Sequence, residues 1–172
     1  MGLVVLAGVV TGAAILEIKG SRAVTSELAT RAAAPRPRPP LTRAEEAYIQ
    51  ALSPIHGEVE RSAVRMSLGQ IFYKTHDMGK AELKTRVDEA LASFRRSEAR
   101  LRTLAPPPSL QRSHGDYLSA VRLFERSAVE VRRMFEDGNE DHLRAAYPLS
   151  KEGSDKIREL GVKFWPDEFP PN

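Results

Sequence analysis

Cysteine does not occur anywhere in the 172-residue chain. Its absence excludes disulfide bonds, thiolate metal sites, attachment of c-type haem, cysteine nucleophiles and a lipid-modified cysteine. It does not indicate the compartment, because a helical bundle without disulfides is normal on either side of a bacterial membrane.

Metal-binding and catalytic motifs are also missing. A di-iron helix pairs a glutamate with a histidine three residues later, which places both ligands on one helical face. At that distance the four histidines are preceded by Ser53, Tyr73, Gln111 and Asn139. No His-Glu-x-x-His helix, nucleophile elbow or phosphate-binding loop occurs. We therefore expect no catalytic residue, no metal site, no cofactor, and a protein that is not an enzyme.

The excess of positive charge is confined to one short stretch. The net charge is +3, but residues 19–43 hold six basic residues and one acidic residue, whereas residues 44–172 hold 20 basic and 21 acidic residues. A surface that follows phosphates needs clustered cationic groups. We expect a nearly neutral folded domain and no binding to nucleic acid.

A short hydrophobic run opens the chain. Residues 3–16 are apolar or small apart from Thr11, and no lysine or arginine precedes them. Extended to Ile18, a helix of these 16 residues spans about 24 Å, less than the hydrocarbon core of about 30 Å. The small-residue cluster at 32–34 lies far from the run, so no clear cleavage site follows it. Residues 1–34 are predicted to be an anchor or signal segment with a basic flank. The alternative is a helix packed in the domain.

Two signals disagree about the side of the membrane on which the rest of the chain lies. The six basic residues follow the run, and the positive-inside rule keeps such a flank in the cytoplasm. A single apolar segment and a proline-rich tether are instead typical of a domain sent outward. We expect a bundle attached to the membrane through its N-terminal segment and facing outward, with a cytoplasmic-facing membrane protein as the alternative.

Prolines and helical periodicity divide the remaining chain. Residues 35–41 form a Pro/Arg-rich linker of extended type. Thr42 and Glu45 have the spacing of a capping box. From there residues of one face recur at alternating spacings of four and three, which predicts an amphipathic helix to about Tyr73 with a kink at Pro54. This seam is formed by Tyr48, Leu52, Ile55, Val59, Ser62, Met66, Gly69 and Tyr73.

Three further helices are predicted, over residues 80–104, from Leu110 to Gly138, and from Leu143 to Phe164 with an interruption at Pro148. The seam of the helix from Leu110 is formed by Leu110, His114, Tyr117, Val121, Phe124, Ala128, Val131 and Phe135. Their short connections favour an all-α, up-down-up-down four-helix bundle over residues 42–164, preceded by the N-terminal hydrophobic helix and the Pro-rich linker. The Pro/aromatic tail, residues 165–172, is expected to fold back over one end of the bundle. The alternative is a partner-binding motif.

Two histidines are weak candidates for a ligand site. His114 lies on the apolar seam of the third helix, and His56 lies beside the seam of the first. If these faces meet, the imidazoles can bind a metal, haem iron or another small ligand, or act as a pH switch. The alternative is that each packs at the bundle edge with a nitrogen hydrogen-bonded.

A proline break links two of the helices and carries a family resemblance. It reads Leu-x-x-Leu-Ala-Pro-Pro from Leu101 and is followed by Leu110, His114 and Tyr117. Over about residues 83–160 the chain resembles a loose group of small bacterial exported or membrane-anchored helical proteins of unknown function. That resemblance implies a bundle and an envelope location, and no activity. The plan also resembles the sensory domain of chemoreceptors, but this sequence contains no second membrane helix and no signalling module.

The leading hypothesis is a membrane-tethered or exported bundle that acts as a non-catalytic interaction module of the cell envelope, with an envelope protein as partner. The alternative is a bundle that binds a small ligand, metal or haem through His114 and His56.

Overall fold

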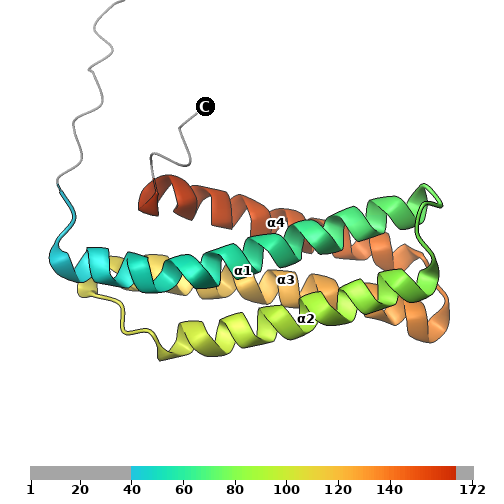
Figure 1. Cartoon of the computed structure of the whole chain (residues 1–172), viewed down its shortest axis with the longest axis horizontal. Coiled ribbons are helices and arrows are strands. Elements are labelled where there is room, and N and C mark those ends of the chain that lie inside the picture. Colours follow the sequence, from blue (N-terminus) through green and yellow to red (C-terminus); the bar gives the residue numbers. More distant parts are fainter. Residues whose placement is uncertain (1–39, 166–172) are drawn as a thin grey trace, which may run out of the picture. The chain divides into compact units, whose positions relative to one another are not determined.

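The computed structural model describes residues 40–165, which form an all-α bundle of four helices (Figure 1). The helices are α1 (Arg43–Lys74), α2 (Lys80–Thr103), α3 (Gln111–Asp137) and α4 (Asp141–Phe164), with a short 3-10 helix, η1 (Pro108–Leu110), before α3. The prediction of an all-α fold with four helices is confirmed. The predicted anchor, most of the linker and residues 166–172 lie outside the described residues.

α1 begins with the predicted capping box. The Thr42 hydroxyl accepts from the backbone N–H of Glu45, and the Glu45 carboxylate accepts from the backbone N–H of Thr42 at 2.7 Å. Glu45 also accepts from the Ser109 hydroxyl, and these hydrogen bonds lower the pKa of its carboxyl group, with Ser109 as the largest cause. The contact joins the start of α1 to the segment before α3.

The buried face of α1 follows the predicted seam, since Leu52, Ile55 and Val59 are almost completely buried. The helix continues through Pro54. α4 likewise continues through Pro148, so the predicted interruption there is wrong. Proline removes one backbone donor from a helix, but α4 packs along the whole of α3, and that packing holds the turn.

The predicted C-terminal ends of α2 and α3 are correct. α2 ends at Thr103, directly before the proline break, and α3 ends where Gly138 takes a left-handed conformation with φ of 78°. Glycine has no Cβ to clash in that conformation, which is why it terminates the helix. The 3-10 turn between the prolines and α3 was not predicted.

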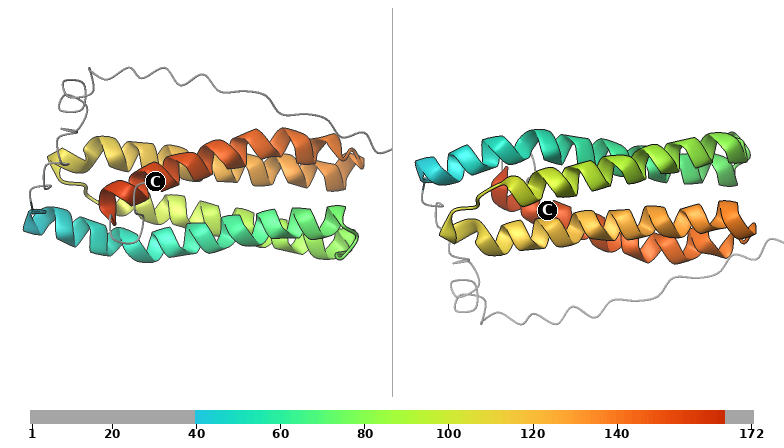
Figure 2. Two further views of the ribbon diagram at one scale, coloured as in Figure 1. Left: turned by 90° about the horizontal axis from the view of Figure 1, so that it is seen from above. Right: turned by 90° about the horizontal axis from the view of Figure 1, so that it is seen from below.

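α1 packs on α2, α2 on α3, and α3 on α4, whereas α1 and α4 touch at only a few residues. α4 comes closer to α1 toward its C-terminal end (Figure 2). Phe94 of α2 and Phe124 of α3 stack in the core with ring centroids 5.4 Å apart. Among residues 40–165, no helix is both long enough and apolar enough to cross a bilayer.

Candidate functional site

Two histidine–tyrosine pairs connect α1 to α3. The Tyr48 hydroxyl lies 2.9 Å from Nδ1 of His114, and the Tyr117 hydroxyl lies 2.9 Å from Nδ1 of His56. Each helix therefore supplies one histidine and one tyrosine. The structure brings both predicted histidines to the same part of the bundle, but each contacts a tyrosine of the other helix.

His56 is only 6% exposed and is held on three sides. Its Nε2 lies 3.2 Å from a carboxylate oxygen of Glu60, and its ring stacks on Trp165 with centroids 4.5 Å apart. Because a carboxylate only accepts, the nearby Glu60 favours the tautomer with the proton on Nε2, in which Nδ1 accepts from the Tyr117 hydroxyl. Burial raises the pKa of Tyr117, and the nearby Glu60 charge adds to the effect. The arrangement keeps Tyr117 a neutral donor.

His114 lies in a more open position. Desolvation by partial burial lowers its pKa, and burial raises the pKa of Tyr48 to about 12. Tyr48 also packs edge-on against Phe164. Within the described part of the chain, Nε2 of His114 has no hydrogen-bond partner. Binding of one ligand by both histidines would require the tyrosine contacts or the Glu60 contact to break.

Sequence reasoning did not identify Tyr48, Tyr117 and Trp165 as contacts of the two histidines. Tyr48 and Tyr117 were assigned to apolar seams, and both are indeed buried. Their pairing with the histidines depends on how far α1 is shifted along α3, which helical periodicity does not determine. A tyrosine on each of two predicted seams, with a histidine on one seam and beside the other, is the sequence signal for such histidine–tyrosine pairs.

A third histidine, His142 of α4, lies near the C-terminal end of α3, and its pKa is shifted in the opposite direction from that of His114. His142 Nδ1 lies 2.7 Å from Glu130, and Nε2 lies 2.8 Å from Asp137. These two carboxylates, Glu130 first, raise the pKa of His142. No group of three or more His, Asp or Glu side chains between residues 40 and 165 is arranged to hold a metal ion.

NMR titration of the imidazole signals should separate these histidines. His142 is expected to titrate above 6.5, its ordinary value, and His114 below it. The stabilising contribution of His142 is complete below pH 6.5 and is lost as the pH rises through its folded pKa. His114 favours the neutral form, so its contribution is present above pH 6.5 and is lost as the pH falls through its folded pKa. The variants His142→Gln and His114→Gln assign the NMR signals to the two residues. The same titration midpoint for both histidines would contradict the described contacts.

Arginines on α2 and α3 do not form a free cationic patch. Arg96 and Arg100 both donate to Glu58, and Arg102 and Arg122 both donate to Glu98. The two arginine donors lower the pKa of Glu98. Exposed pairs of this kind contribute little to stability, but they neutralise the surface.

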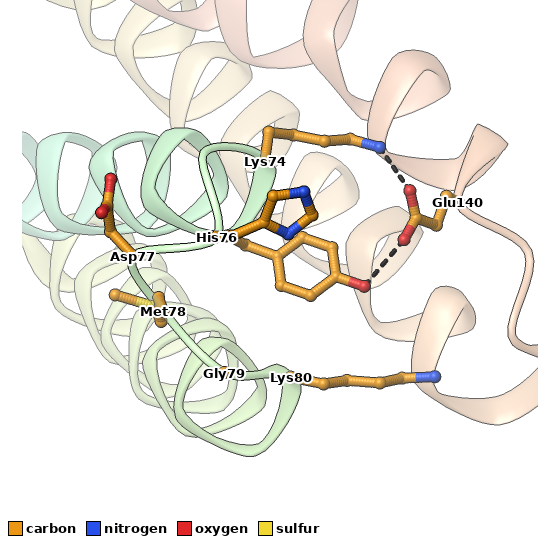
Figure 3. A pocket seen from close by; sticks show the side chains of 8 residues that line it. Lys74, His76, Asp77, Met78, Gly79, Lys80 and Glu140 are labelled. Carbon is orange, nitrogen blue, oxygen red and sulfur yellow. Dashed lines mark hydrogen bonds and ion pairs between the residues drawn. The ribbon is translucent and has the colours of Figure 1, made fainter.

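A shallow cleft lies beside the turn between α1 and α2 (Figure 3). Lys74 and the Tyr73 hydroxyl both donate to Glu140, and these contacts, Lys74 first, lower the pKa of that carboxyl group. His76 has a left-handed backbone with φ of 65°, which costs free energy in a residue other than glycine. The charges in this cleft largely satisfy one another, and no ligand chemistry stands out.

The outward side of α1 carries a group of exposed apolar side chains, which we call the α1 apolar face. It consists of Val64, Leu68, Ile71 and Phe72, which are 57%, 43%, 55% and 39% exposed. Val64 also borders a groove between α1 and α4 whose floor is the buried Phe124 and Ile157, and whose rim includes Glu60 and Arg158. Val64 therefore belongs to both the α1 apolar face and the groove.

No family model, curated protein or solved structure matches this chain.

Proposed function

We propose that this protein is a non-catalytic interaction module of the cell envelope, an up-down-up-down bundle tethered or exported through its N-terminal hydrophobic segment and Pro-rich linker. The α1 apolar face is the observation that carries the proposal. Four large apolar side chains of one helix, close together and partly exposed, are typical of a protein contact.

The rest of the described bundle supports binding over chemistry. The buried histidine is held by Tyr117, Glu60 and Trp165, and the most buried tyrosine keeps its proton. A catalytic base needs access to a substrate and a pKa near the working pH. These interior side chains therefore stabilise the fold, and we place the function on the surface of the bundle.

Photo-crosslinking of the full chain in its own membranes tests the proposal. A photoreactive amino acid in place of Leu68 should give a discrete adduct of higher mass, because that side chain lies at the centre of the α1 apolar face. The matched control is the same substitution at Tyr147 of α4, which is 66% exposed and apolar but lies outside this face. The control should give less than about a tenth of the adduct, if specific packing makes the contact.

No adduct at Leu68, or equal adducts at Leu68 and Tyr147, would remove the basis of the proposal. Binding of a small ligand, metal or haem through His114 and His56 stays an alternative prediction. Purified full-length protein with a Soret band or bound metal that His114→Ala removes would support that alternative.

A further inference from the structure

The α1 apolar face has the spacing of a second helix–helix seam. Val64, Leu68 and Ile71 follow one another at steps of four and three, as in the core positions of a coiled coil. Met66 is fully buried, and the two residues from Met66 to Leu68 rotate the side-chain direction by about 200°. Leu68 therefore points away from the bundle core. α1 has one apolar face for its own bundle and another for a second helix.

We propose that the second helix is α1 of another copy of this chain, packed parallel and in register through Val64, Leu68 and Ile71. This inference rests on the proposed function and names the partner. Glu60 and Arg65 flank the seam on opposite sides, and both side chains are partly exposed. Across a parallel seam, flanking residues five positions apart face each other. Glu60 of each copy therefore faces Arg65 of the other, which gives two opposite-charge pairs.

An antiparallel arrangement lacks this complementarity. Centred on Leu68, it places Arg65 against the apolar Ile71 and Phe72 of the other copy. Glu60 then lies beyond the seam, opposite the turn after α1. In that arrangement neither Glu60 nor Arg65 gains an opposite charge across the seam, so the two favourable pairs of the parallel arrangement are lost. The charge pattern of α1 selects the parallel arrangement.

Both charged side chains reach the surface: Glu60 lies 3.2 Å from Nε2 of His56 through one carboxylate oxygen, and its side chain is still 43% exposed. Arg65 is 3.6 Å from Glu89, which is too far for a good hydrogen bond, and both side chains are mostly exposed. Arg61 occupies the next position of the seam toward the N-terminus, but its guanidinium Nη1 lies only 3.0 Å from where a Cβ of Gly57 would be. Position 57 is glycine and is itself the next position of the seam, so the Arg61 side chain folds back over it and away from Val64 and Leu68.

The contact is small, so the dimer is expected to be weak in dilute solution. A parallel seam places both α1 N-termini at the same end. That geometry fits two copies tethered to one membrane, where the high local concentration promotes a weak contact.

Single-cysteine crosslinking tests the inference cleanly, because the natural chain contains no cysteine. Full-length Leu68→Cys and Arg61→Cys proteins, reconstituted in liposomes and treated with a mild oxidant, should both form disulfide dimers at least about tenfold faster than Tyr147→Cys. Adding Ile71→Glu to Leu68→Cys should reduce dimer formation by at least about tenfold, because it buries unpaired charge in the seam. Circular dichroism and thermal unfolding show whether each variant still folds.

A charge exchange tests the register independently. In the Leu68→Cys chain, Glu60→Arg should slow dimer formation, and addition of Arg65→Glu should restore it. Dimers from Leu68→Cys but not from Arg61→Cys would overturn the parallel register, because an antiparallel seam separates the two Arg61 positions. If no variant forms a dimer while the photoreactive Leu68 chain captures a different protein, the self-association is wrong and the proposed interaction function stands. If neither experiment gives a product, both are wrong.

Discussion

Phe94→Ala should lower the free energy of unfolding by about 3–5 kcal/mol, a large share of the stability of a single domain. Phe94 is completely buried and stacks on Phe124, which also lies against Gly153 of α4. Removal of the ring leaves a cavity where three helices meet, and the neighbouring backbones cannot close it fully. Urea unfolding followed by circular dichroism measures the loss.

Phe72→Ala is the matched control, since it removes the same side chain from the α1 apolar face, where 39% of it is exposed. Its cost should stay below about 1 kcal/mol at low protein concentration, as for most surface substitutions. Similar losses for the two variants would mean that Phe94 does not lie in a closely packed core.

Tyr117→Phe should lower the free energy of unfolding by about 1–3 kcal/mol, although it removes a single oxygen atom. The lost hydroxyl is the partner of Nδ1 of the buried His56. Without it, Nδ1 loses the hydrogen bond to Tyr117 in the interior, where water cannot easily take the place of the hydroxyl. Urea unfolding of the variant and the unchanged protein at one fixed pH measures the loss.

Tyr48→Phe provides the comparison, because its partner His114 is only partly buried. Water can reach His114 after the substitution, so the expected loss is smaller, at most about 1 kcal/mol. A larger loss from Tyr48→Phe than from Tyr117→Phe would show that the pair with the more exposed histidine contributes more to the fold.

The helices and their ends were predictable because local signals decide them. The capping box at Thr42, the proline break after Thr103 and the left-handed Gly138 act within a few residues of where they occur. The buried face of α3 was predicted less well at its far end. There Met134 is buried and Phe135 only partly so. The buried residues of α3 themselves repeat every seven residues, at Ser113, Ala120, Ser127 and Met134. The predicted seam had the right period but omitted this row and ran instead through His114 and Phe135, which are only partly buried.

The candidate site was less predictable because it depends on contacts between distant parts of the chain. His56 and His114 were identified from their positions on helices, but their partners Tyr117 and Tyr48 follow from the alignment of α1 with α3. The α1 apolar face was missed for a different reason. Val64 and Leu68 lie outside the seam that fills the core, and a second periodic face on the same helix is easily overlooked.

Few residues of α1 and α4 touch, so the side of the bundle between these two helices is its least closely packed side. α1 is joined to α2, and α4 to α3, whereas the remaining side is closed mainly where α4 approaches α1 at its C-terminal end. Local opening of a protein follows its least packed boundary. The diagonal hydrogen bonds from Tyr48 and His56 to α3 tie α1 across the interior, at the end where Trp165 covers His56. Away from that end, the α1–α4 boundary is where we expect amide hydrogens to exchange first.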